Sequence, residues 1–203
     1  MAFYKPKGLV STCDSSIENN IISFIENEAS RTDSPILDEI LNTRIYPIGR
    51  LDKNSEGLMI LTNDGELTNL LTHPKHEHEK EYIVRCQKPL SKSFISKFAS
   101  GVEIEIDDKS SAPQLKRTKP CKVVQISDYE FQTILEQGYK RQIRKMVEKL
   151  GNKVTKLKRI RIANISIQDN LINPYPPNII TVLRLKEGAF KKLKYRLKLF
   201  KKP

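Results

Sequence analysis

The stretch YPIGRLDKNSEGLMILTNDGEL, residues 46–67, decides the fold and carries the first candidate for a functional residue. The apolar run at 58–61 predicts a buried strand, because continuous apolar residues between polar turns suit a strand that is covered on both faces. Just before this run, Gly49 permits a tight bend, Arg50 offers a planar fork of donors and Asp52 supplies a carboxylate. A carboxylate at the lip of a buried strand is a candidate for chemistry.

Two other interpretations of Asp52 need no catalysis. With its polar neighbours it can form a turn or a cap ahead of the strand. Asp52, Asn54, Glu56 and Gly57 also match the first half of a calcium-binding EF-hand loop. The pattern argues against calcium, because Asn63 stands where the loop needs a bidentate glutamate and the apolar run closes it to water. Chemistry alone leaves the turn and the functional carboxylate open.

Four segments follow one another in a characteristic order: FYKPKGLVST at 3–12, GRLD with the following serine, Glu-Gly and apolar run at 49–65, LTHPKHEHEKEYIV at 71–84, and GYKRQIRKMVEKLGNKVTKLKRIRI at 138–162. In this order they resemble the motifs of bacterial-type RNA pseudouridine synthases, namely the ribosomal small-subunit group with its large-subunit relatives. Together they cover most of residues 3–165. Ala163 departs from the pattern, because the family usually has glycine after this Arg-Ile pair.

The resemblance implies an enzyme that isomerises a uridine in RNA to pseudouridine without a cofactor or a metal ion. It implies that Asp52 is the catalytic carboxylate, either as nucleophile or as base. Tyr82 matches the tyrosine that stacks on the target base. Arg144 matches the basic residue that pairs with the aspartate, and Arg50 one that holds phosphate. Two apolar positions are implied to line the uracil pocket, Leu51 and Leu157.

The charge distribution independently predicts an RNA partner. Lysine and arginine number 36 against 24 aspartate and glutamate, which gives a formal net charge of +12. The excess is concentrated late, since residues 139–161 hold ten basic residues and a single acidic one, Glu148. Such a face attracts a phosphate backbone, although a lysine-rich solvated surface has the same composition. Besides Arg50, the residues predicted to contact RNA are Lys140, Arg141, Lys145, Lys156, Lys158, Arg159 and Arg161.

Other features limit the class of protein and its compartment. The three cysteines lie far apart with no CxxC pair, which favours a cytoplasmic, reducing compartment, and an organellar one fits as well. No apolar run approaches about 18 residues, so no membrane partner is expected. His73, His76 and His78 lack the cysteine or carboxylate that would complete a convincing metal set. We expect a monomer.

Local patterns predict helices and strands in mixture. Helical spacing is found at 17–25, 35–41, 65–71, 90–99 and 143–150, where the last helix buries one stripe and ends at Gly151. Strands are expected at 3–12, 81–86, 102–106, 158–167 and 179–185. A hairpin is expected from 122–126 and 129–135, and a polar loop at 107–120. The pattern is that of an α+β protein.

The resemblance adds the arrangement of these elements. It implies a mixed, mainly antiparallel central sheet with flanking helices, a pseudouridine-synthase catalytic core that is bilobal around a basic cleft. The catalytic domain is expected at 1–185 and a basic tail at 186–203. No S4-like RNA-binding module is expected before it, as in some large-subunit members, so ribosomal RNA of the large subunit is favoured over that of the small subunit.

Two other function classes compete with the synthase. In a non-catalytic, ribosome-associated RNA-binding protein, charge explains the composition and Asp52 is only a turn residue. A glycoside hydrolase would need a second carboxylate about 5 to 10 Å from Asp52, with Glu56 or Asp64 as the candidates.

Overall fold

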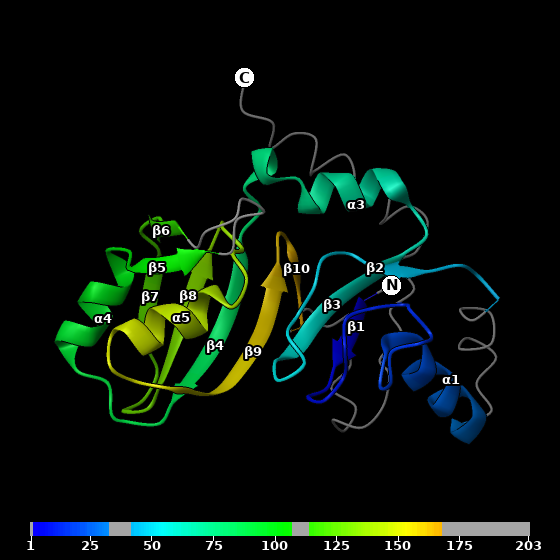
Figure 1. Ribbon diagram of the computed structural model, residues 1–203, viewed down its shortest axis with the longest axis horizontal. Helices are drawn as coiled ribbons and strands as arrows, with labels where there is room; N and C mark the ends of the chain where they lie inside the picture. The colour runs from blue at the N-terminus through cyan, green and yellow to red at the C-terminus, as the bar shows by residue number, and fades with distance from the viewer. Residues whose placement is uncertain (1, 33–41, 107–113, 168–203) are drawn as a thin grey trace. The chain divides into compact units, whose positions relative to one another are not determined.

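The computed structural model describes residues 2–32, 42–106 and 114–167 of the 203-residue chain. The chain forms two compact units, one of Met1–Glu77 with Ile165–Pro203 and one of His78–Asn164. Each unit combines helices with antiparallel strands (Figure 1). The predicted α+β fold with mainly antiparallel strands is therefore confirmed.

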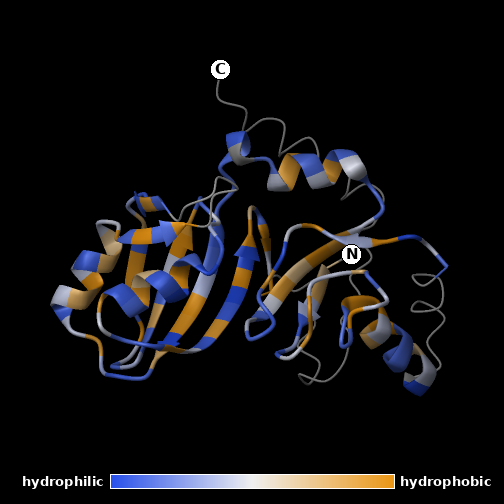
Figure 2. Ribbon diagram, viewed as in Figure 1, coloured by the Kyte–Doolittle hydropathy of each residue, from blue (hydrophilic) through white to orange (hydrophobic). Residues whose placement is uncertain are grey.

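The first unit is built around β3 (Glu56–Thr62), the strand predicted from the apolar run. β1 (Ala2–Lys5) pairs antiparallel with residues 57–60 of β3, and β2 (Tyr46–Pro47) pairs antiparallel with residues 61–62. Residues 58–61 are at most 1% exposed, and β3 is mainly hydrophobic in Figure 2. β3 is buried on both faces, as its continuous apolar run predicted.

The first helix, α1 (Ile21–Thr32), is capped by a buried asparagine. The Asn20 Oδ1 atom accepts a hydrogen bond from the Ser23 amide at 2.9 Å, which satisfies a free N–H of the first turn. Ile21 and Ile25 are fully buried on its inner face. Ile17 was expected in the same helix but precedes it and is 40% exposed, because the helix begins only at its cap.

The carboxyl end of β3 leads directly into α3 (Gly65–Thr72), as predicted. The Asp64 Oδ1 atom caps this helix by accepting from the Leu67 amide at 3.0 Å. A short 3₁₀ turn, η1 (Pro74–His76), follows, and β10 (Ile165–Ser166) closes the described part of the unit. The helix predicted at 35–41 and the strand predicted at 179–185 lie outside the described residues.

The second unit contains an antiparallel sheet in the order β9 (Val154–Ile162), β4 (Lys80–Cys86), β8 (Glu130–Leu135) and β7 (Lys122–Gln125). β7 and β8 form the predicted hairpin. β9 begins earlier than the predicted residue 158, because two register shifts against β4 break the alternation of buried and exposed residues that marks a strand.

A separate two-stranded ribbon joins β5 (Glu103–Ile106) to β6 (Gln114–Arg117). The prediction of a polar loop throughout 107–120 was wrong at β6. All four side chains of β6 are exposed, so no apolar alternation marks it, and its pairing with the backbone of β5 specifies the strand.

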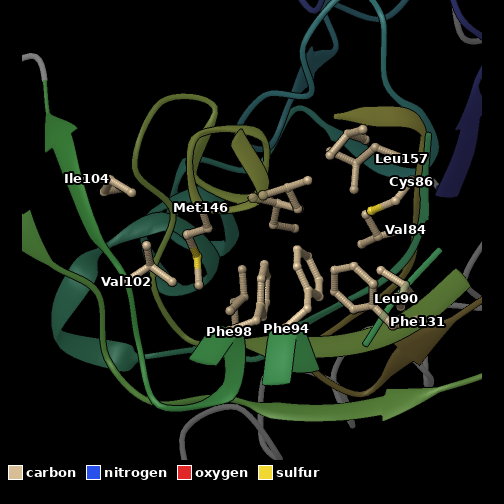
Figure 3. Close-up of a cluster of buried hydrophobic side chains, with 14 residues drawn as sticks. Val84, Cys86, Leu90, Phe94, Phe98, Val102, Ile104, Phe131, Met146 and Leu157 are labelled. Atoms are coloured by element: carbon tan, nitrogen blue, oxygen red, sulfur yellow. The ribbon is translucent and has the colours of Figure 1, made fainter. Parts of the chain in front are cut away.

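The core of the second unit lies between one face of its sheet and two helices, α4 (Lys92–Ala99) and α5 (Gln142–Lys149). Val84 and Leu157 are paired across β4 and β9 on this face. Figure 3 shows Phe94 and Phe98 of α4 beside Phe131 of β8; the rings of Phe98 and Phe131 are 4.9 Å apart in an edge-to-face arrangement. This packing fixes the orientation of β4 and β9 relative to α5.

The basic helix α5 has the ends that its sequence predicted. Ile143, Met146 and Val147 are buried in the core, and Gly151 takes a left-handed φ of +78° that terminates the helix.

None of the helices in the described residues has the length and the hydrophobicity of a membrane span.

Candidate active site

The loop that carries Asp52 enters from β2 through a bend at Gly49, whose φ of +72° favours glycine. The amide of Ile48 still donates to the Ile60 carbonyl of β3, at 2.7 Å. Beyond the bend, the chain places Arg50 on the surface, buries Leu51 to 7% exposure and leaves Asp52 half-buried. Three predicted site residues thus follow one another with three different degrees of exposure.

Ser11 fixes the residue that precedes Asp52. Its hydroxyl donates to the Leu51 carbonyl at 2.7 Å and accepts from the Leu51 amide at 3.1 Å. Both hydrogen bonds are buried, so Ser11 satisfies the backbone N–H and C=O groups of Leu51 in place of water. Ser11 lies in the FYKPKGLVST segment, which gives this segment a role in holding the loop.

The backbone of Asp52 begins a turn, because its carbonyl accepts from the Ser55 amide at 2.9 Å. The turn interpretation of the sequence was therefore right about the backbone, and it does not compete with a function of the half-buried side chain. The Gly8 amide donates to the Lys53 carbonyl at 2.8 Å. The turn is therefore held both by its own hydrogen bond and by one from a segment distant in sequence.

Lys5 contributes the other contacts to this turn. Its side chain is fully buried, and its ammonium donates to the carbonyls of Ser55 at 2.7 Å and Pro6 at 3.0 Å, with Lys53 at 3.4 Å. Sequence reasoning missed Lys5 and Ser11. The available signal was the β1 pattern, in which Lys5 falls on the same face as the buried Phe3.

Tyr82 lies in β4 of the second unit, half-buried on the face that packs against the core. It stands opposite Arg159 of β9 on the same face of the sheet. Leu157, two residues before Arg159, is 6% exposed and belongs to the core cluster. The structure therefore brings Tyr82, Leu157 and Arg159 to one face of the sheet.

The basic residues of α5 differ in their surroundings. Lys140 and Arg141 are exposed just before its first turn, where Arg141 has a left-handed φ of +56°. Lys145 is half-buried and donates to the Glu105 carbonyl at 2.7 Å. Arg144 is half-buried on the border of the helix stripe, as predicted, and its Nη1 atom is 3.4 Å from the Val154 carbonyl.

The two arginines of β9 that were predicted to contact RNA, Arg159 and Arg161, are less exposed than Lys140 and Arg141. Arg159 is only 4% exposed, and burial lowers the pKa of its guanidinium, against the opposing effect of Tyr82. Arg161 donates to the carboxylates of Glu79, at 2.8 Å, and Glu81. The sequence could not distinguish them from Lys156, which is exposed, or Lys158, which is half-buried, because the register shifts decide which side chains turn inward.

The predicted site residues are divided between the units. Arg50, Leu51 and Asp52 belong to the first unit, and Tyr82, Arg144, Leu157 and the other basic residues belong to the second. In the described ranges, no group of three or more histidine, cysteine and carboxylate side chains is arranged to hold a metal ion. The candidate residues offer a carboxylate in the first unit and a phenol and guanidinium groups in the second.

Comparison with known proteins shows the family of the chain. The chain belongs to the RNA pseudouridylate synthase family, whose model matches residues 1–149. It is similar to the dual-specificity RNA pseudouridine synthase RluF of Salmonella typhi, with 36% identity over 202 residues, 98% of this chain and 62% of the relative.

Two further similarities agree with this assignment. The ribosomal large subunit pseudouridine synthase B of Bacillus subtilis is 32% identical over 170 residues, which are 81% of this chain and 62% of the relative. A crystal structure of a pseudouridylate synthase matches with a TM-score of 0.62 and 29% identity, and the match covers 82% of this chain and 65% of that one. The chain thus spans less than two thirds of the length of these relatives.

Proposed function

We propose that this chain is an RNA pseudouridine synthase in which Asp52 is the catalytic carboxylate. The observation that carries the proposal is the way the Asp52 turn is held. Lys5, Ser11 and Gly8 all bind backbone atoms of residues 51–55, within the part of the chain that matches the family. Fixed geometry of this kind is what a catalytic carboxylate needs and a solvated turn does not.

The reaction breaks the bond between C1′ of the ribose and N1 of uracil and forms a bond between C1′ and C5. The base rotates in between, N1 gains a proton and C5 loses its own to solvent. Asp52 acts either as nucleophile at the sugar or as the base that starts glycal formation. No cofactor or metal ion enters this scheme.

The other site residues have roles that follow from their chemistry. Tyr82 stacks on the flipped uracil, and Arg144 pairs with Asp52 and aims its carboxylate, because a guanidinium is a planar fork that matches a carboxylate. Leu51 and Leu157 line the uracil pocket. Arg50 is exposed on the Asp52 loop, where it holds phosphate and offsets part of the cost of flipping the nucleotide, about a few kcal/mol.

The substrate proposed is ribosomal RNA, with large-subunit RNA favoured over small-subunit RNA. Two relatives support this, since one is named a dual-specificity RNA synthase and the other a ribosomal large subunit synthase. We further propose a monomer in a reducing, cytoplasmic compartment. All three cysteines are free, and burial raises the pKa of the Cys86 thiol to about 11, which suits a structural role.

Tritium release from C5-labelled uridine in unmodified ribosomal RNA tests the activity, since only the isomerisation frees that hydrogen. We expect release by the wild type and none by Asp52→Asn. Asp128→Asn, at the exposed hairpin turn between β7 and β8, is the matched control and should retain release. Equal release by the wild type and Asp52→Asn would refute the role of Asp52. RNA binding without release by the wild type would favour the non-catalytic RNA-binding protein.

A further inference from the structure

A register shift sets the residue that stands opposite Tyr82. Glu81 of β4 pairs with Arg161 of β9, so a regular antiparallel ladder would place Ile160 opposite Tyr82. The shift between Glu81 and Tyr82 instead places Arg159 there. β-Bulges are a means of re-aiming a side chain. Because of this bulge, the cross-strand partner of Tyr82 is the charged Arg159 and not the apolar Ile160.

The same shift sends Arg159 inward. Val84 and Leu157 are paired in the core, and the pair two residues further along, Tyr82 and Arg159, lies on the same face. Arg159 is 4% exposed, whereas Lys156 on the same strand is exposed. A side chain so deeply buried is poorly placed to bind a phosphate on the surface, which is the role that its position in a basic segment suggested.

Tyr82 is the cross-strand partner of this buried cation on the same face of the sheet, and its hydroxyl oxygen is an acceptor for the guanidinium. Burial of a guanidinium is costly unless its donors are used, so a donor–acceptor pair at this position has a fixed geometry. A second cation, Lys80, precedes Tyr82 by two residues on the same strand. Burial and, to a smaller extent, repulsion by Arg159 lower the pKa of its ammonium. The Lys80 ammonium is directed to the His78 carbonyl, at 3.0 Å.

We infer that Arg159 is a positioning residue of the candidate site: its buried guanidinium holds the Tyr82 hydroxyl and thereby fixes the ring against the target uracil. The inference rests on the proposed role of Tyr82. The Tyr82 ring already packs against the core. The contact at the hydroxyl therefore has only the rotation and tilt of the ring left to restrict. The acceptor side of the hydroxyl is used by Arg159, and its proton stays available for a ligand.

A double-mutant cycle tests this inference, because a residue that acts through another loses its effect when that other group is absent. Turnover is measured by tritium release for the wild type, Arg159→Met, Tyr82→Phe and the double variant. We expect Arg159→Met to lower kcat roughly 10- to 100-fold in the wild-type background, the loss of one charge-assisted hydrogen bond. In the Tyr82→Phe background it should lower kcat by less than about threefold, with KM little changed in both.

Two further variants separate geometry from charge. Arg159→Lys keeps the cation and a hydrogen-bond donor but not the planar fork, so it should recover part of kcat. Arg85→Met removes a cation from the same strand as Tyr82, on the opposite face and in an exposed position, and should leave kcat unchanged. An equal loss of kcat in both Tyr82 backgrounds, a loss confined to KM, or the same loss in Arg85→Met would each overturn the inference.

Stability measurements keep the test independent of the proposed activity. If Arg159→Met does not fold, Arg159→Lys takes its place in the cycle. If the wild type shows no turnover, the proposed function fails, and the same four proteins are compared by urea unfolding. If the effects of the two substitutions on the urea midpoint are not additive, the contact between Arg159 and Tyr82 is still supported. Additive effects would overturn it.

Discussion

The ammonium nitrogen of Lys5 lies 2.7 Å from the carbonyl oxygen of Ser55, in a position with no solvent exposure. The same nitrogen approaches the carbonyls of Pro6 and Lys53. An ammonium has three donors and is costly to bury when they are unused. Lys5 therefore joins the first strand to the turn that follows Asp52, and the conformation of that turn depends on a residue far away in sequence.

Lys5→Met should weaken both stability and turnover. It leaves buried carbonyls of the turn without their donor, which costs about 1–3 kcal/mol in the free energy of unfolding. Urea unfolding measures this loss, and tritium release measures turnover. Lys7→Met removes an exposed lysine from the same segment and should change stability by less than about 0.5 kcal/mol. If the two variants were equally stable, Lys5 would not hold the turn.

Ser11→Ala should act on the residue that precedes Asp52. The substitution removes the hydroxyl that both donates to and accepts from the backbone of Leu51, so two buried polar groups lose their partner. We expect a loss of about 1–3 kcal/mol in unfolding free energy, together with a lower kcat. Ser16→Ala removes an exposed hydrogen bond to Asp14 and serves as the control. A Ser11→Ala variant with unchanged stability and kcat would show that Ser11 does not position the loop.

The sequence predicted those elements in which one strong local pattern agrees with the packing. The apolar run at 58–61, the stripe that ends at Gly151 and the hairpin around residues 127–128 are all confirmed. β6 was missed because its side chains are all exposed, so only pairing with a distant segment defines it. Patterns of burial are encoded locally, whereas pairing between exposed backbones is not.

The residues of the candidate site also divide into those that a local pattern predicts and those whose placement depends on pairing with a distant segment. The position of Asp52 before a buried strand was evident from the sequence, and so was the border position of Arg144 on α5. The inward turn of Arg159 was not, because it depends on a register shift between β4 and β9. Lys5 was also missed, since a lysine in a short strand is expected at the surface unless its carbonyl partners are known.

The Cys86 thiol should make stability fall at alkaline pH. Burial raises its pKa from the ordinary 9.0 to about 11. Between these values the unfolded chain releases the thiol proton while the folded chain keeps it, so the contribution is complete below about pH 9 and lost by about pH 11. Cys86→Val removes this titration. Urea unfolding at pH 8 to 11 should therefore show the variant gaining on the wild type as pH rises, and parallel curves would contradict the prediction.

Lys140 and Arg161 should respond differently to salt, although both lie in the basic segment. Lys140 is exposed before α5, and Lys140→Ala should lower RNA affinity and reduce the slope of log K against log salt by about 0.7 to 0.9, the value for one phosphate contact. Arg161 lies between the carboxylates of Glu79 and Glu81, which repel phosphate. Arg161→Ala should leave the slope unchanged.

The Arg161→Ala variant should instead lose stability. The Arg161 side chain is 22% exposed and donates to two carboxylates and to the Ala163 carbonyl. Its removal leaves the two carboxylates without the cation that they share, which costs about 1–3 kcal/mol in the free energy of unfolding. Filter binding across salt concentrations and urea unfolding measure the two effects separately. A reduced salt slope with unchanged stability would assign Arg161 to the RNA contact, whereas the opposite result assigns it to the pairing of β9 with β4.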